Sequence, residues 1–483
     1  MRSEKKDFWN SGLTSSLVDK EEIKMPEMLL GYFIGPFGAL LSSGIFTSML
    51  QKYLNEVLGL SNSFLTALPL ISTVLIVIAN LVVGQLIERT KAMAGKARPW
   101  ILLSAFTLSV ASVLMFIVPA EGMARMVWIA IAYNLYYSVA YPIYNTANST
   151  LVSVSTRKTE QRGAVASFMN IAGLAVMGAG SMVFPIVASN VLKNDQAKWF
   201  VVMLAVAIFS ALAIYLQYRF TRERVTEEDL QKNTTQTKEQ VSIHKQLQAV
   251  AGEKWWWIIM LFYLFFQWSG AIKNGSMTQF CEWVIDTGLV GNDWGIAQTI
   301  LSIAGAVPMA VAAVFVIPLT NKYGKARVTG VFMLIGAAGG VLAGLFSHNI
   351  VLVGIGVSLK CLGSSPACYM ILAMLADVID HIEYKTGLRT DGLTMSIYSS
   401  LMVAASPIGT SIMNALLNVA GFNPNLVYGE GAQSVAAQSA LTVSYIWIET
   451  VAYGICAILI FLFTVEKNLK AEQDEIKKRK GLI

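Results

Sequence analysis

About a dozen long apolar stretches recur along the 483 residues of this chain. Each runs for roughly 18–25 residues, enough for a helix to cross about 30 Å of hydrocarbon. Hydrophobic residues make up 55% of the chain and charged residues only 14%, whereas soluble domains carry about 25% charged residues. We place the spans at 28–50, 64–87, 99–118, 126–152, 164–191, 198–218, 255–285, 294–319, 328–346, 351–375, 392–420 and 441–465. The expected fold class is therefore an all-α polytopic membrane protein.

Two short motifs each occur twice in the chain. Gly-Lys-Ala-Arg stands at Gly95–Arg98 and again at Gly324–Arg327, and Lys-Thr-x-x-Arg stands at Lys158–Arg162 and at Lys385–Arg389. Both repeats have nearly the same offset, close to half the chain, and they come in the same order. This pattern favours a duplicated architecture. Because both halves consist of hydrophobic segments, the duplication points to a transporter made of two membrane bundles.

The expected domain organisation follows the polar stretches. We divide the chain into an N-terminal segment, a first six-helix bundle, a linker, a second six-helix bundle and a basic tail, at 1–26, 27–218, 219–254, 255–466 and 467–483. Part of the linker, between Ser242 and Ala251, has helical character. The first 26 residues are polar, so no cleavable signal peptide is expected.

Lysine and arginine residues gather in the loops on the side of the chain termini, while the opposite loops hold few. This bias predicts that both termini are cytoplasmic. The apolar composition makes the lipid bilayer of the cell membrane an expected partner. The net charge of +6 arises mostly from these loop lysines and arginines. It is therefore no sign of a nucleic-acid partner, and none is expected. The four cysteines all fall within apolar segments, which predicts neither a disulfide framework nor a zinc site.

One string carries a specific family resemblance. Residues 376–392, with Asp377, Asp380, Glu383 and Arg389, resemble the loop between spans ten and eleven of the glycoside–pentoside–hexuronide:cation symporter family, which includes melibiose permease. Further matches lie along the chain in the expected order, at Gly84, 95–100, 55–61 and 421–425. The resemblance implies the major facilitator fold, with about 12 transmembrane helices in two six-helix halves, and transport by alternating access.

The same string predicts a gate. Asp377, Asp380 and Glu383 are spaced by three residues, so a helix places them on one face. We expect them to pair with basic residues when the cytoplasmic side closes, which gives the gate set Arg98, Arg162, Asp377, Asp380, Glu383 and Arg389. The alternative is a solvated loop whose surface ion pairs contribute about 0–1 kcal/mol each.

The coupling-cation site of the family is degenerate here. In the family, the second span carries two carboxylates, and this chain has Ile76 and Asn80 at those positions. A hard cation needs several oxygen ligands, which these residues do not supply. Asn145 likewise replaces a carboxylate of the fourth span. Sodium coupling through this site is not expected.

The substrate site is expected to rely on aromatic and amide side chains. We predict the following substrate-binding residues: Tyr141, Tyr144, Asn145, Asn148, Trp268, Asn274, Lys360 and Tyr398. Aromatic stripes also arise from helix packing, which is the alternative for each residue. Lys273, Lys360 and Glu449 are ionisable residues deep in apolar segments, where charge is costly and marks a cavity or a partner.

These observations favour a secondary transporter of a sugar or glycoside-like solute. The alternative is a uniporter or proton-linked carrier of an amphipathic or anionic non-sugar solute. A membrane sensor that transports nothing is the third hypothesis. The chain has no phosphate-binding loop and no His-Glu-x-x-His motif, so neither an enzyme nor a cofactor or metal is expected. The expected partners are a small-molecule solute and either a proton or sodium as coupling ion.

Overall fold

The computed structural model describes residues 14–18, 22–90, 92–118, 121–156, 159–225, 243–388, 390–429 and 431–479. In this part of the chain the backbone is overwhelmingly helical. Helices of the first half are α1 (Gly35–Lys52), α2 (Asn62–Arg89), α3 (Arg98–Leu114), α4 (Gly122–Asn134), α5 (Tyr141–Ser155), α6 (Thr159–Gly178), α7 (Phe184–Val187) and α8 (Gln196–Arg219). Those of the second half are α10 (Ile243–Ala251), α11 (Lys254–Trp283), α12 (Trp294–Tyr323), α13 (Lys325–Leu345), α14 (Ile350–Thr386), α15 (Asp391–Val419), α16 (Val435–Thr442), α17 (Ile448–Leu462) and α18 (Leu469–Arg479).

Wide π-helical turns join several of these helices into longer segments. They lie at Glu27–Ile34, Tyr53–Val57, Leu135–Ala140, Ala179–Val183, Ala188–Leu192 and Val443–Trp447. Pro36, Pro142 and Pro185 each follow one of these turns closely. A proline lacks the N–H of the regular ladder and its ring crowds the carbonyl four residues earlier, so a wider turn there relieves the clash.

The predicted all-α membrane fold is confirmed. Within the described residues the helices and π-helical turns make twelve long segments, and each overlaps one predicted span. Ten of the helices are long and apolar enough to cross a membrane. The third segment, Arg98–Leu114, is apolar but shorter, and the fourth, Gly122–Ser155, carries many of the polar residues singled out above. The helix expected near residues 242–251 is confirmed as α10.

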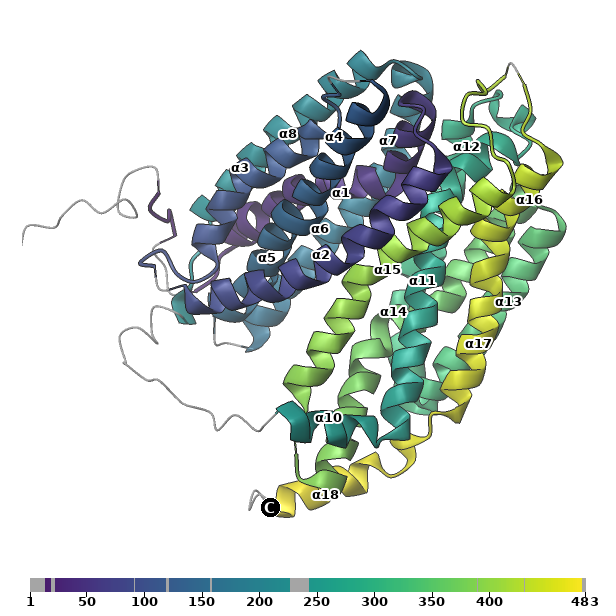
Figure 1. Cartoon of the computed structure of the whole chain (residues 1–483). Helices are drawn as coiled ribbons and strands as arrows, with labels where there is room; N and C mark the ends of the chain where they lie inside the picture. The colour runs from purple at the N-terminus through teal and green to yellow at the C-terminus, as the bar shows by residue number, and fades with distance from the viewer. Residues whose placement is uncertain are drawn as a thin grey trace, which may run out of the picture. The chain divides into compact units, whose positions relative to one another are not determined.

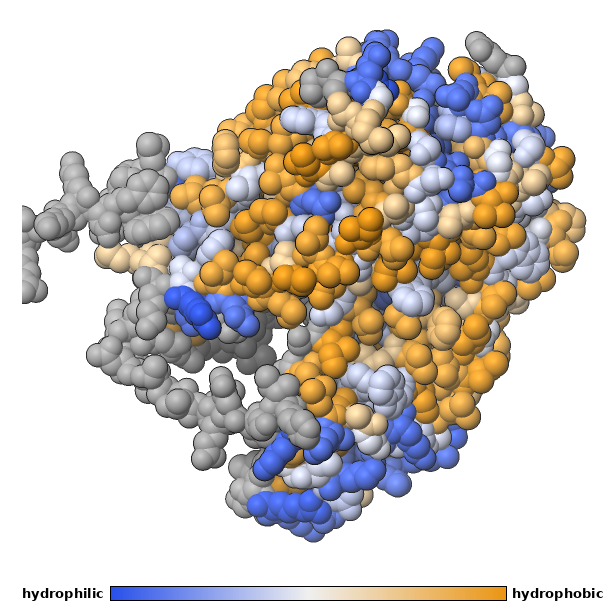
Figure 2. Space-filling model, in the orientation of Figure 1, coloured by the Kyte–Doolittle hydropathy of each residue, from blue (hydrophilic) through white to orange (hydrophobic). Residues whose placement is uncertain are grey.

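Contacts between Cα atoms divide the chain into two compact units. The first holds Met1–Leu60 and Leu70–Thr237, and the second holds Ser61–Pro69 and Lys238–Ile483. The boundary thus falls inside α2. Figure 1 shows the long helices of each unit running side by side, and Figure 2 shows hydrophobic residues covering their flanks. Hydrophilic residues gather where α10 and α18 lie, at one end of the second unit.

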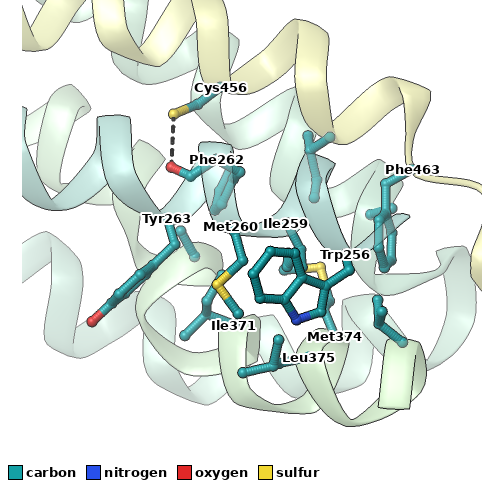
Figure 3. Packing of buried hydrophobic residues seen from close by; sticks show 14 of the residues in the cluster. Trp256, Ile259, Met260, Phe262, Tyr263, Ile371, Met374, Leu375, Cys456 and Phe463 are labelled. Carbon is teal, nitrogen blue, oxygen red and sulfur yellow. Dashed lines mark hydrogen bonds between the residues drawn. The ribbon is translucent and has the colours of Figure 1, made fainter. Parts of the chain in front are cut away.

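The second unit packs around a buried apolar cluster from α11, α14 and α17. Trp256, Met260 and Phe262 of α11 meet Met374 of α14 there (Figure 3). The thiol of Cys456 on α17 lies 3.5 Å from the carbonyl oxygen of Phe262. Such interlocking leaves little room for the helices to rotate about their axes.

Glycines bring α13 and α14 into close contact. A Cβ atom added at Gly339 would lie 2.7 Å from the carbonyl oxygen of Gly356, and one at Gly363 would lie 2.5 Å from the Cα of Gly336. Larger residues would push the helices apart. Close approach of small residues is a main source of helix association in membranes.

Candidate functional site

Predicted substrate residues of α5 are bound to α8. The hydroxyl of Tyr144 donates a hydrogen bond to Oε1 of Gln217, at 2.7 Å. The Nε2 of Gln217 in turn donates to Oδ1 of Asn148, also at 2.7 Å. All three side chains are buried. Their hydrogen-bonding groups are largely used within the bundle, and the sequence did not single out Gln217.

Asn145 and Tyr141 differ from Tyr144 and Asn148. Asn145 is partly exposed, and in the described part of the chain no hydrogen bond of its side-chain amide is found. Tyr141 lies next to Tyr136, with ring centroids 6.2 Å apart, and the hydroxyl of Tyr136 lies 3.0 Å from Oγ of Ser42. Asn145 and Tyr141 are thus the predicted α5 residues that are not fully buried.

The two positions of the degenerate cation site lie on α2. Ile76 is buried at 3% exposure. The side-chain amide of Asn80 donates to the backbone carbonyl of Ile76, at 2.8 Å. The carbonyl oxygen of the Asn80 amide is therefore the one side-chain acceptor that these two positions supply.

The predicted residues of α11 and α15 fall into two kinds. Tyr398 of α15 stacks on Tyr263 of α11, with ring centroids 4.3 Å apart. Trp268 and Asn274 of α11 are partly exposed, and neither side chain hydrogen-bonds within the described residues. Trp268 and Asn274 therefore have polar groups available, while the ring of Tyr398 packs between helices.

Three ionisable residues from three helices meet in the second unit. Nζ of Lys360 on α14 lies 2.6 Å from Oε2 of Glu449 on α17, and Nζ of Lys273 on α11 lies 3.7 Å from Oε1 of the same carboxylate. The hydroxyl of Tyr453 donates to Oε1 as well, at 3.1 Å. The sequence identified each ionisable residue but not that they pair, because their separation along the chain gives no sign of it.

Each Gly-Lys-Ala-Arg loop wraps around a carboxylate. In the first loop, backbone N–H groups of Lys96, Ala97 and Arg98 donate to the carboxylate of Glu223, at 2.7–2.8 Å. Gly95 has φ +111°, and a Cβ atom there would collide with that carboxylate. Negative charge at the start of α3 also suits the helix dipole.

The second loop repeats this arrangement in a looser form. The N–H of Ala326, at the start of α13, donates to Oε1 of Glu466 at 3.2 Å. Gly324 has φ +91°, and a Cβ there would lie 2.9 Å from Oε2 of Glu466. The reasoning from sequence missed both glutamates. A repeated Phe-Thr-x-Glu-Arg/Lys motif at 220–224 and 463–467 marks them.

Arg98, a predicted gate residue, is held inside the first unit. Its side chain is buried, and Nη2 donates to the carbonyl oxygen of Tyr218 at 3.0 Å. Its guanidinium also lies over the Tyr218 ring, 4.6 Å from the centroid. Arg327, its counterpart in the repeat, is exposed. Arg98 therefore ties α3 to α8.

The three gate acids lie on α14, which continues beyond the predicted end of its span. The helix runs to Thr386, so the three-residue spacing does fall on a helix. Asp377 pairs with Lys325, and a carboxylate oxygen of Asp380 accepts from Gln473 of α18 at 2.8 Å. Glu383 is buried. Of the basic gate residues, Arg389 and the side chain of Arg162 lie outside the described residues, so their pairing stays a prediction.

Further contacts hold α10 and α18 against α14. His381 lies 2.8 Å from a carboxylate oxygen of Glu472 on α18. Nζ of Lys385 lies 2.9 Å from a carboxylate oxygen of Glu253, the residue directly before α11. These contacts hold the charged end of α14 against α18 and against the residues between α10 and α11.

The Lys325–Asp377 pair gives a stability prediction. The side chains of Lys325 and Asp377 are 28% and 9% exposed. An unpaired carboxylate at Asp377 therefore costs more free energy than an unpaired ammonium at Lys325. We expect Lys325→Met to cost about 1–3 kcal/mol of unfolding free energy, the cost of an unsatisfied buried group, and Asp377→Asn to cost less. The double variant should recover most of the loss. Thermal unfolding in detergent measures this, and equal losses for both single variants would contradict it.

The comparisons with known proteins agree with one another. The family model of MFS/sugar transport proteins matches residues 31–467. The isoprimeverose transporter of Lactiplantibacillus pentosus is 26% identical over 464 residues, which cover 94% of this chain and 91% of that protein. The lactose permease of Leuconostoc lactis is 24% identical, covering 88% of this chain and 65% of the permease.

A solved structure of similar fold extends this comparison. The inward-facing, unoccupied structure of a bacterial homolog of the human lysosomal transporter Spinster superposes with a TM-score of 0.63. It covers 93% of this chain and 99% of that chain, at 12% sequence identity. At such low identity it shows the fold alone.

Proposed function

Since this chain belongs to the MFS/sugar transport protein family, we propose that it carries a sugar or glycoside-like solute without the two-carboxylate cation site on α2. It is a multi-pass membrane transporter of the major facilitator fold. The resemblance to glycoside–pentoside–hexuronide symporters is confirmed by the family match and the sugar-transporting relatives. Transport by alternating access is consistent with this family and fold.

The family match over residues 31–467 carries the proposal, because it runs through both halves of the chain. The sugar class is supported by the names of the relatives, an isoprimeverose transporter and a lactose permease. The partly exposed side chains of Tyr141, Asn145, Trp268 and Asn274 suit a glycoside. Aromatic rings stack on sugar faces, and amides exchange neutral hydrogen bonds with hydroxyls.

The placement in the cell is part of the same proposal. We assign the chain to the cell membrane, with both termini cytoplasmic, on the lysine and arginine bias of its loops. The halves 27–218 and 255–466, joined by a cytoplasmic linker, carry the two sets of spans. The acids of α14, together with Arg162 and Arg389, form the proposed cytoplasmic gate, while Arg98 ties α3 to α8.

Counterflow in proteoliposomes tests the proposal. Vesicles preloaded with an unlabelled glycoside receive a trace of the labelled one, and exchange needs no ion gradient. We expect labelled glycoside to enter at the same rate in sodium and in potassium buffer, because Ile76 and Asn80 offer no carboxylate to sodium. Liposomes without protein are the control. A strict sodium requirement would contradict the lost cation site, and absence of exchange with any sugar would contradict the sugar class.

A further inference from the structure

The cluster of Lys273, Lys360 and Glu449 carries an unbalanced charge. Two ammonium groups share one carboxylate, and among the described residues no other carboxylate lies within ion-pair distance of either lysine. The three residues lie on helices that cross the membrane. A net positive charge in that surrounding is costly unless an anion compensates it.

The two lysines are not equivalent. Lys360 is 3% exposed in its side chain. Its Nζ reaches Oε2 of Glu449 and also the backbone carbonyls of Tyr445 and Ile446, at 3.4 and 3.3 Å. An ammonium has three N–H donors, so those of Lys360 are fully used. The wide turn at Val443–Trp447 contains both carbonyls.

Lys273 is held loosely by comparison. Within the described residues its ammonium pairs with Oε1 of Glu449, at 3.7 Å, and its side chain is 19% exposed. Lys273 is thus the more exposed and the more weakly paired of the two lysines.

We infer that Lys273 is the recognition residue for a singly charged oxyanion, a carboxylate or sulfonate, on the transported solute. This inference rests on the proposed function and narrows its substrate class to acidic glycosides. Glu449 and Lys360 are positioning residues. Their short ion pair fixes the carboxylate, and the carboxylate orients the ammonium of Lys273. One bound anion brings the cluster to charge neutrality.

Matched pairs of glycosides test the inference. Counterflow of methyl glucuronide and of methyl 6-sulfoglucoside is compared with that of neutral methyl glucoside, which differs at one carbon. We expect both anions to exchange, and to compete with each other more strongly than the neutral sugar does. The substitution Lys273→Gln should lower anion exchange at least about tenfold, the effect of one lost charge-assisted hydrogen bond. Exchange of methyl glucoside should not change.

The variants separate recognition from folding. Lys273→Gln leaves the Lys360–Glu449 pair balanced, so we expect it to fold, and Lys273→Arg should retain anion exchange. Lys198→Gln is the control, since Lys198 is an exposed lysine whose side chain is 55% exposed. The competition assay uses the unaltered protein, so its result does not depend on whether any variant folds.

Three results would overturn the inference. Exchange of neutral glycosides in preference to the anions would refute it and leave the proposed function intact. Equal loss of both exchanges in Lys273→Gln would assign Lys273 a structural role. Exchange of neither class would refute the inference together with the proposed function.

Discussion

Replacing Glu449 by alanine should destabilise the second unit by about 3–5 kcal/mol, the cost of breaking a buried ion pair by removing one partner. Lys360 would keep two backbone carbonyls as partners but lose the 2.6 Å contact with the carboxylate. Its side chain is only 3% exposed, so the ammonium would stay buried without a carboxylate partner. Lys273 is more exposed and would contribute less to the loss.

A double variant distinguishes the loss of charge pairing from the loss of packing. In Glu449→Ala/Lys360→Met, both members of the pair are replaced by apolar groups, and such replacements are often close to neutral. We expect this variant to regain most of the lost stability. Glu475→Ala is the matched control, because Glu475 pairs with Arg479 at the surface, with side chains 49% and 52% exposed. That pair should contribute at most about 1 kcal/mol.

Thermal unfolding of the purified protein in detergent measures these effects. Glu449→Ala should unfold well below the unaltered protein, and the double variant should approach it. An unfolding temperature for Glu449→Ala equal to that of Glu475→Ala would mean that the lysines find other partners. The charge balance argued for the cluster would then be wrong.

Glu223→Ala should lower the free energy of unfolding by about 3 kcal/mol, the second large effect that we expect. The reason is that several backbone N–H groups would lose their acceptor. The side chain is 1% exposed and accepts from the N–H groups of Lys96, Ala97 and Arg98. Two of these three bonds end on Oε1. Glu223→Gln retains a carbonyl oxygen that can take that place, so it should lose less than Glu223→Ala.

The duplicated loop supplies an internal comparison. Glu466 accepts from the N–H of Ala326 at 3.2 Å, a longer bond than any of the three at Glu223. We therefore expect Glu466→Ala to cost clearly less than Glu223→Ala in the same unfolding assay. A loss at Glu466 as large as that at Glu223 would show that the backbone N–H groups do not set the cost.

Hydrophobicity along the chain was enough to predict the helical segments. Lipid requires an apolar stretch of a definite length, and this requirement is local, so it can be read from the residues in order. The duplicated Gly-Lys-Ala-Arg motif predicted two similar halves, and both of its glycines have the positive φ that glycine tolerates. The end of α14 was placed too early because its last turns are charged. Those turns remain helical and are held by α18 and the residues after α10.

The candidate site was only partly predictable. Lys273, Lys360 and Glu449 drew attention because each is a charge in an apolar segment, yet their separate positions gave no sign that they meet. Tyr144 and Asn148 were predicted as ligands of a solute, and Gln217 of α8 takes up their hydrogen bonds instead. The roles of the predicted substrate and gate residues stay predictions.

Composition and residue order were enough to predict the membrane-spanning segments, their approximate number and the family resemblance. These properties depend on composition and order, which a linear chain expresses directly. Which side chains meet could be seen only once the helices were packed in three dimensions. The rotation of α11, α14 and α17 about their axes is set by packing, such as that of Cys456 against Phe262 and of Gly339 against Gly356. That packing brings Lys273 and Lys360 to the carboxylate of Glu449, although the three residues are far apart in the chain.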